Sequence, residues 1–218
     1  MENLNQMELK NSIQSRLDRG IEYRNLTLSI AETEGDETSY RVTGYATTFN
    51  EPYTLWEFDD ERVDEVVDAR AFDSCQMDDV IMQYDHQGRV FARTRNNTLT
   101  LTPDEHGLRV EADLGGTDIG RQLWQEISGG YTDRMSFGFI VSGSDVTERI
   151  EDGKRILERR ITGISRLFDV SAVSLPANDG TAISARSVSE GLLTEADAER
   201  RRMMARQKLE LKLKLMEV

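Results

Sequence analysis

Proton transfer near neutral pH is the chemistry that the two histidines of this 218-residue chain could perform. The chain has only two histidines, and an imidazole, with its unperturbed pKa of about 6.5, suits a general base. His86 follows an apolar run and precedes a Gly turn, where the end of a strand would present its ring to a cleft. His106 lies in the polar turn segment TPDEHGLRV. His86 is therefore the better candidate base.

Ser136 is the candidate nucleophile because it is a small hydroxyl residue within the apolar strand segment MSFGF. The nearby Gly138 would let a substrate or another backbone approach closely. Side chains alternate along a strand, so Ser136 and Gly138 share one face, opposite Met135, Phe137 and Phe139. The same pattern fits a serine on the polar face of an amphipathic strand. A catalytic role for Ser136 therefore depends on a neighbouring base.

A third residue must hold the imidazole in the right tautomer and stabilise its positive charge, as a partly buried carboxylate does. Asp169 is an acid inside the apolar segment RLFDVSAVSLPA, and buried acids are rarely left unpaired. A salt bridge to Arg160 or Arg166 is the alternative role for Asp169. Glu158, in the highly charged segment RILERR, competes for the position of third catalytic residue.

Cys75 is the only cysteine, which excludes an intramolecular disulfide and the paired-cysteine spacings of structural zinc sites. Its acidic neighbours Asp73 and Asp79 would raise the pKa of the thiol, so a packing role is favoured over a nucleophilic one. Chemistry by serine, histidine and a carboxylate requires no metal and no cofactor, and we expect neither.

The charge balance and the hydropathy of the chain exclude two classes of partner. The formal net charge of −13 argues against a dedicated nucleic-acid-binding protein, because phosphate binding needs an excess of Lys and Arg. No apolar run approaches the ~20 residues of a membrane span, and the N-terminal segment is too polar for a signal peptide. We expect a cytoplasmic protein without a membrane partner.

Short segments rich in β-branched and aromatic residues follow one another from Tyr23 onward, and several alternate apolar with polar positions. This pattern predicts a mainly antiparallel β domain with helices, of the α+β class. The predicted strands are NLTLSI, YRVTGYATTF, TLTLTP, GLRVEADL, MSFGFIVSG, KRILERRITGI and DVSAVSL.

Two stretches break the strand pattern: EVVDARAFDSC near residue 70, and residues 116–130. The second stretch has apolar residues at helical spacing before a Gly-Gly stop, which predicts an amphipathic helix. A further segment of strong helix formers runs from Leu193 to the end and becomes basic. We therefore predict an N-terminal tail over 1–20, a folded domain over 21–186, and a linker with a C-terminal helical extension over 187–218.

Several motifs occur in an order that is more specific than any one of them, over about residues 23 to 186. They are Val42-Thr43-Gly44-Tyr45-Ala46 with Phe49-Asn50, Arg70-Ala71-Phe72, Asp85-His86 with Arg93-Thr94, Asn97-Thr98-Leu99 with Gly107-Leu108, Arg134-Met135-Ser136-Phe137-Gly138-Phe139, and Phe168-Asp169-Val170-Ser171-Ala172-Val173 ending at Pro176-Ala177. Together they resemble the prohead (capsid maturation) proteases of tailed phages of the HK97 type, which share a fold with the herpesvirus assemblins.

The resemblance implies a compact β barrel ringed by helices, with His86 as base, Ser136 as nucleophile and Asp169 as third catalytic residue. Family members commonly have Glu at this last position. The assemblins have a second histidine there, and the absence of any histidine after His106 excludes a Ser-His-His arrangement.

The implied function is that of a serine endopeptidase that cleaves scaffold and major capsid protein, and itself, inside the procapsid in the host cytoplasm. The enzyme would be an oligomer within the prohead. The helical extension would serve packaging, so deletion of residues 187–218 is expected to leave peptidase activity and abolish incorporation into proheads.

Two other functions compete with this one. The first is a non-enzymatic head assembly or scaffold-binding protein, which would not need the ordered set of His86, Ser136 and Asp169. The second is an unrelated bacterial β-barrel protein with a coiled-coil tail. The tail's leucines disfavour it, because they alternate instead of following a heptad: Leu209, Leu211, Leu213 and Leu215.

Overall fold

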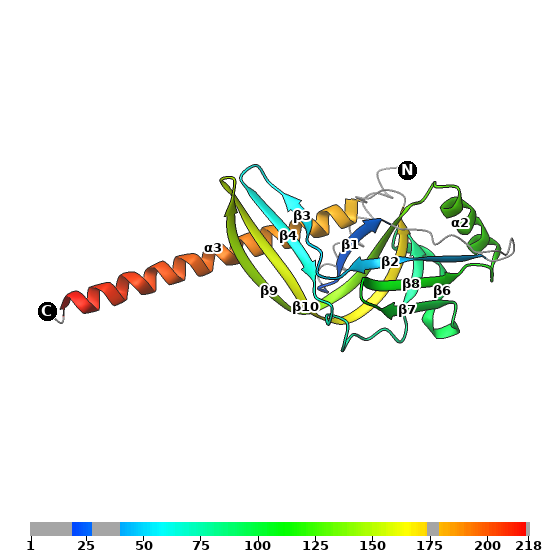
Figure 1. The fold of residues 1–218 in the computed structure, drawn as a ribbon, viewed down its shortest axis with the longest axis horizontal. Coiled ribbons are helices and arrows are strands. Elements are labelled where there is room, and N and C mark those ends of the chain that lie inside the picture. The colour runs from blue at the N-terminus through cyan, green and yellow to red at the C-terminus, as the bar shows by residue number, and fades with distance from the viewer. Residues whose placement is uncertain (1–18, 28–39, 174–178, 217–218) are drawn as a thin grey trace.

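The computed structural model describes residues 19–27, 40–173 and 179–216, which form two β-sheets, two α-helices and a short 3₁₀ helix (Figure 1). The strands are β1 (Glu22–Thr27), β2 (Arg41–Thr48), β3 (Tyr53–Glu57), β4 (Glu61–Val67), β5 (Ile81–Tyr84), β6 (Gln87–Arg93), β7 (Leu99–Pro103), β8 (Gly107–Asp113), β9 (Arg134–Glu151) and β10 (Lys154–Val173). The helices are η1 (Thr94–Asn96), α2 (Asp118–Ser128) and α3 (Asp179–Met216).

A long hairpin of β9 and β10 is the centre of the larger sheet, in which the described strands follow the order β1-β9-β10-β4-β3 (Figure 1). Its turn is Asp152-Gly153, and both residues have positive φ angles, of 50° and 79°. An Asp-Gly pair is well suited to such a turn, because both residues tolerate positive φ and the turn's twist matches the right-handed twist of the two strands. The hairpin therefore closes tightly and holds β9 against β10.

β10 has different parallel neighbours along its two halves. Its first half pairs with β4, from Arg155 to Ile161, and its second half pairs with β5, from Asp169 to Ala172. Between them the β9–β10 pairing is interrupted by register shifts, which bend a strand and increase its twist. The bend lets one strand position both the β3–β4 pair and the β5–β6 hairpin.

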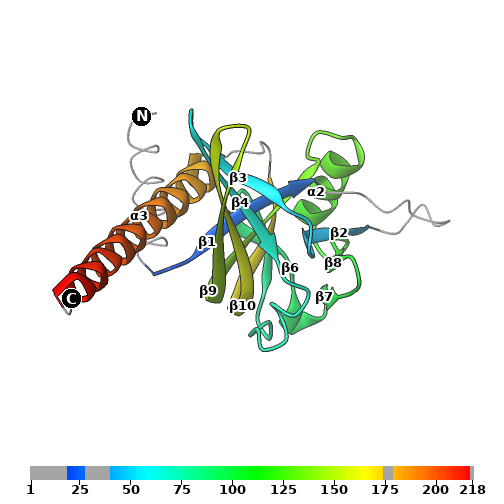
Figure 2. The same ribbon diagram turned by 60° about the vertical axis from the view of Figure 1, so that its left-hand side comes forward.

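The smaller sheet has the order β2-β8-β7, and its apolar face joins the main core. Val42, Leu108 and Val110 of this sheet lie in one buried cluster with Phe137 and Val170 of the larger sheet. The core therefore joins the two sheets and also includes Leu123 and Ile127 of α2. Figures 1 and 2 show the arrangement of these elements from two sides.

Helix α2 confirms the amphipathic helix predicted over 116–130. The hydroxyl of Thr117 caps its first turn by accepting a hydrogen bond from the Gly120 amide at 3.1 Å. Leu123 and Ile127 are buried on the face that the apolar spacing indicated. The helix ends at Ser128, a few residues before β9, the strand that carries Ser136.

Helix α3 is continuous from Asp179 to Met216. It runs through the position of the domain boundary predicted between residues 186 and 187, and that division into domains stays a prediction. Its first part packs on the larger sheet, where Ala185 and Leu193 share a second apolar cluster with Leu55, Val63 and Leu157. From residue 199 to 214 every residue is exposed, and the helix projects away from the sheets (Figure 1).

The α+β class and the C-terminal helix are confirmed. No closed barrel is found among the described strands, so that part of the prediction is not confirmed. The strand end predicted before His86 is that of β5, whereas β3, β4 and β6 were not among the predicted strands. KRILERRITGI and DVSAVSL belong to one strand, β10. Most of the predicted N-terminal tail and the second half of NLTLSI lie outside the described residues.

Candidate active site

His86 lies in the two-residue turn of the β5–β6 hairpin, where Tyr84 pairs with Gln87. Asp85 and His86 both have left-handed backbone angles, with φ of 49° and 57°. For residues other than glycine such angles cost of order 1–3 kcal/mol each and persist where the surroundings impose them. The Asp85 amide donates to the Ala172 carbonyl of β10 at 2.9 Å, which ties the turn to the larger sheet.

Ser136 and Asp169 lie on one face of the β9–β10 pair, in neighbouring rows. Asp169 is opposite Gly138, and Ser136 is opposite Ser171. A register shift between Leu167 and Asp169 adds one residue to β10 at this point. The bulge therefore sets which residue of β10 stands opposite Gly138.

The structure brings the three predicted catalytic residues into direct contact. Nδ1 of His86 lies 2.5 Å from Oδ2 of Asp169, and Nε2 lies 2.6 Å from Oγ of Ser136. An ionised carboxylate can only accept hydrogen bonds, so the proton of the neutral ring belongs on Nδ1. Nε2 then carries a lone pair that accepts the Ser136 proton. This is the tautomer that a general base for serine requires.

All three side chains are shielded from water. The exposed fractions are 8% for His86, 4% for Asp169 and 0% for Ser136. A low-dielectric surrounding strengthens each of these hydrogen bonds.

Strand β1 completes the site on the other edge of β9. Tyr23 is paired with Gly138, and its ring meets the His86 ring edge-on, with 4.4 Å between centroids. Tyr23, Gly138 and Asp169 therefore form one row across three strands, and the imidazole of His86 contacts both outer members of that row.

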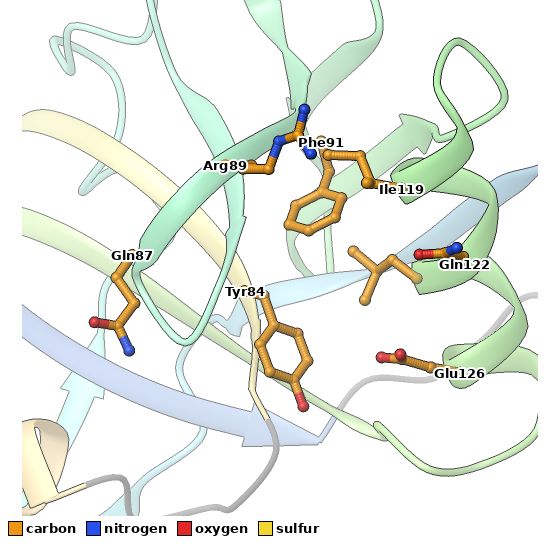
Figure 3. A pocket seen from close by; sticks show the side chains of 8 residues that line it. Tyr84, Gln87, Arg89, Phe91, Ile119, Gln122 and Glu126 are labelled. Carbon is orange, nitrogen blue, oxygen red and sulfur yellow. The ribbon is translucent and has the colours of Figure 1, made fainter. Parts of the chain in front are cut away.

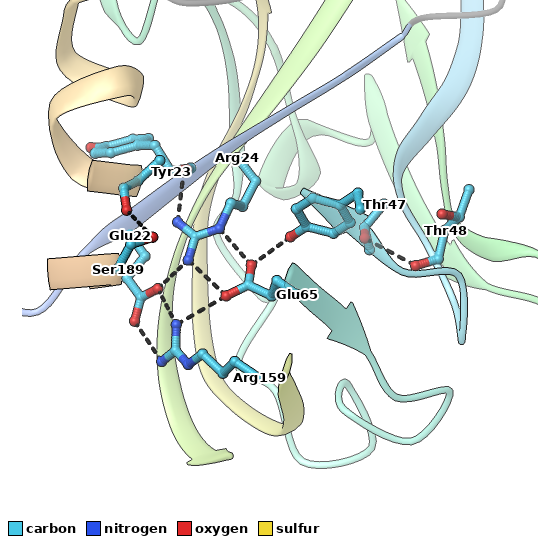
Figure 4. A network of polar contacts seen from close by, with 10 residues as sticks. Glu22, Tyr23, Arg24, Thr47, Thr48, Glu65, Arg159 and Ser189 are labelled. Carbon is cyan, nitrogen blue, oxygen red and sulfur yellow. Dashed lines mark hydrogen bonds and ion pairs between the residues drawn. The ribbon is translucent and has the colours of Figure 1, made fainter. Parts of the chain in front are cut away.

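A buried cluster of four charges fastens β1 to the rest of the sheet (Figure 4). Arg24 donates two hydrogen bonds to Glu65, at 2.5 and 2.9 Å, and Arg159 bonds to Glu65 and Glu22. The Tyr53 hydroxyl also donates to Glu65, at 2.5 Å. Burial alone would lower the pKa of Arg24, but the carboxylates of Glu65 and Glu22 outweigh it and raise that pKa well above its ordinary value. Each of the two arginines thus lies against the carboxyl groups of both Glu22 and Glu65.

A groove of about 400 Å³ lies beside the His86 turn, between the β5–β6 hairpin and α2 (Figure 3). Tyr84 and Phe91 face Ile119 of α2 across it, and Leu123 of the same helix also lines it. Its polar margin is formed by Gln87, Arg89, Gln122 and Glu126. The groove is therefore built from the two elements that lead directly to His86 and Ser136.

The competing candidates lie elsewhere. His106 is exposed in the β7–β8 turn, against the Tyr45 ring. Glu158 accepts a hydrogen bond from Arg149 at 3.1 Å, in the half of β10 that pairs with β4. Burial raises the pKa of the Cys75 thiol to about 11, which keeps the sulfur protonated and unreactive near neutral pH.

The two arginines considered as partners of Asp169 have other contacts. Arg160 bonds to Asn50 and Asp68, and Arg166 lies over the Phe168 ring at 4.9 Å. The carboxylate of Asp169 is thus directed to His86 and Ser171.

Two side chains at the site were not singled out from the sequence, namely Tyr23 and Ser171. Ser171 follows Asp169 at the strand period of two, which places both on one face and could have suggested a contact. Tyr23 lies 63 residues before His86 in the sequence, and no local pattern links them.

No group of three or more His, Cys, Asp or Glu side chains in the described ranges could hold a metal ion. No helix within those ranges is long and apolar enough to cross a membrane.

A serine, an imidazole and a carboxylate joined by two hydrogen bonds are the arrangement found in serine hydrolases on several unrelated folds. Residues 26–194 match the model of the caudovirus prohead serine protease family. The chain belongs to this family and is a serine protease. The comparisons with curated proteins and with solved structures gave no match.

Proposed function

We propose that this protein is the protease that matures a phage procapsid by cutting scaffold and major capsid protein, and itself, with Ser136 as nucleophile, His86 as base and Asp169 as its support. Family membership supports a role in capsid maturation. The observation that carries the choice of residues is the continuous chain of hydrogen bonds from Asp169 through His86 to Ser136. The reaction takes place inside the procapsid, in the host cytoplasm, where the enzyme is oligomeric.

In the proposed reaction Nε2 of His86 takes the Ser136 proton as Oγ attacks the scissile carbonyl carbon. Asp169 stabilises the imidazolium that forms. The imidazolium gives its proton to the leaving amine, and the C–N bond breaks to leave an acyl-enzyme. Water, deprotonated by His86, then attacks the ester and releases Ser136.

The groove between the β5–β6 hairpin and α2 is proposed to hold an apolar side chain of the substrate. Its apolar surface is formed by Phe91, Ile119 and Leu123, and it begins at the turn that carries His86. Binding there would align the peptide with the nucleophile while leaving the chemistry to the three catalytic residues.

The exposed part of α3 is proposed to serve packaging. It extends away from both sheets and lies outside the two apolar clusters. Its basic residues give it a charge opposite to that of the chain as a whole, which is −13. A partner inside the prohead could therefore bind it without contact with the active site.

The test compares wild type with Ser136→Ala and His86→Ala, each co-expressed with the phage's scaffold and major capsid proteins. Ser74→Ala and His106→Ala, at exposed positions, are matched controls. Chain masses are followed by intact mass spectrometry, and folding by thermal melting. We expect cleavage of scaffold and of the protease itself to fall by about 10⁴-fold or more in the first pair only. Unchanged cleavage in either would overturn the active site and favour a binding role.

A further inference from the structure

Ser171 makes a buried hydrogen bond to the third member of the candidate active site. Its Oγ donates to Oδ2 of Asp169 at 2.7 Å. Oδ2 is also the oxygen that lies 2.5 Å from Nδ1 of His86. The exposed fraction of Ser171 is 0%, so water does not compete for this bond.

Ser171 and Ser136 are direct partners across β10 and β9, yet their hydroxyl groups bond to different residues. The Ser136 hydroxyl meets Nε2 of His86, whereas the Ser171 hydroxyl meets the carboxylate on the far side of the ring. Because an ionised carboxylate only accepts, Ser171 must be the donor and its proton is already engaged. Ser171 is therefore no second nucleophile in this arrangement.

The bond restrains the one torsion by which Asp169 could turn away from His86. Rotation about the bond to the carboxyl carbon would tilt Oδ2 out of line with Nδ1 of His86, and this torsion is broad for aspartate. Oδ1 lies above Gly138, which is the residue opposite Asp169, and forms no hydrogen bond with any described residue. The hydroxyl of Ser171 thus holds the carboxylate at the angle at which an oxygen faces Nδ1 of the imidazole.

We propose that Ser171 is a positioning residue of the catalytic site, which acts on turnover by orienting Asp169 and without touching substrate. The inference rests on the proposed function of Asp169. Removal of a group that orients a metal-binding side chain typically costs 10- to 100-fold in activity, and we expect an effect of this size for a group that orients a catalytic carboxylate. Because Ser171 contacts Asp169 and not the substrate, its loss reduces kcat and leaves KM unchanged.

The test uses Ser171→Ala and Ser171→Thr in the full chain, and Ser171→Ala also in the Asp169→Ala background. The first measurement is of kcat and KM on a peptide substrate. The second is the rate at which a fluorophosphonate labels Ser136, which mass spectrometry follows until even the slow variants have reacted. Melting temperatures show whether each variant folds. The Nδ1 proton resonance of His86 reports directly on its bond to Asp169.

The expected result is a 10- to 100-fold loss of kcat in Ser171→Ala at constant KM, with a shifted Nδ1 resonance and recovery in Ser171→Thr. In the Asp169→Ala background the same change should alter labelling less than about twofold, because there is no carboxylate left to orient. Wild-type kcat in Ser171→Ala, or an equal loss in both backgrounds, would overturn the inference. Undiminished labelling in Ser136→Ala would instead overturn the proposed function itself.

Discussion

Gly138 lies directly opposite Asp169 across β9 and β10, and a methyl group at position 138 would come within 2.5 Å of Asp169 Oδ1. The same group would lie 2.7 Å from the ring of Tyr23. The absence of a side chain at Gly138 is therefore what allows an acid and an aromatic ring to flank the imidazole.

Gly138→Ala should abolish most of the peptidase activity. The added methyl group must displace the carboxylate or the ring, and overpacking of a buried site costs about 1–3 kcal/mol. We expect kcat to fall by about 10²-fold or more, because small displacements of a catalytic group have effects of this size. The assay is peptide cleavage by a variant whose melting shows that it is folded. Gly116→Ala, where an added Cβ meets no atom within 4 Å, should behave as wild type. Full activity of Gly138→Ala would contradict the geometry.

Ile119→Ala tests the groove beside His86. The side chain lines the groove and is only partly buried, so its loss should reduce peptide binding more than stability. The loss of about two to three buried methylene-sized groups, at about 0.8 kcal/mol each, corresponds to roughly 15- to 60-fold in kcat/KM for the peptide. Labelling by a small fluorophosphonate should stay unchanged, since it does not fill the groove. Equal effects on both reactions would show that Ile119 supports the fold and not the substrate.

The charge cluster that fastens β1 predicts a loss of stability in acid. Burial alone would raise the pKa of Glu22, but Arg24 and Arg159 outweigh it and lower this pKa below the ordinary value of 4.5. Ionised Glu22 therefore stabilises the fold above the unfolded-state pKa, and this contribution is lost as the pH falls below about 4.5 and passes through the folded-state pKa.

Glu22→Gln should reduce this pH dependence and cost about 1–3 kcal/mol at neutral pH. The measurement is the free energy of unfolding between pH 7 and 3 for both proteins. Glu105→Gln, in an exposed turn, should retain the wild-type slope. An unaltered slope in Glu22→Gln would show that another group governs the acid response.

Two truncations separate the packed and the projecting parts of α3. A chain ending at Glu199 keeps Leu193 and the ion pair between Arg155 and Asp197, at 2.8 Å. We expect it to fold and to cleave peptides as wild type does, but to be missing from proheads. A chain ending at Arg186 loses the buried Leu193 as well and should be less stable by about 3 kcal/mol. Denaturant unfolding and the composition of purified proheads provide the measurements, and normal incorporation of the Glu199 chain would end the packaging hypothesis.

The local spacing of apolar and polar residues was sufficient to predict some helices and strands and not others. The spacing of Leu123 and Ile127 placed α2, and period-two alternation placed Ser136 and Gly138 on one face. The β3–β4 pair was missed because β4 reads as an acidic segment, ERVDEVV, whose charges suggest solvent. In the structure Asp64 and Glu65 are buried, because arginines from distant strands neutralise them.

The sequence by itself determined which side chains could act as base, nucleophile and acid, because these are properties of residue type and of local burial. Only the tertiary structure shows that Asp169 lies beside His86 whereas Glu158 lies beside Arg149, although both acids belong to β10. β10 pairs with β5 only along its second half, and the bulge before Asp169 sets its position opposite Gly138. Register between strands that are distant in the chain depends on how the whole core packs, and no short segment carries that information.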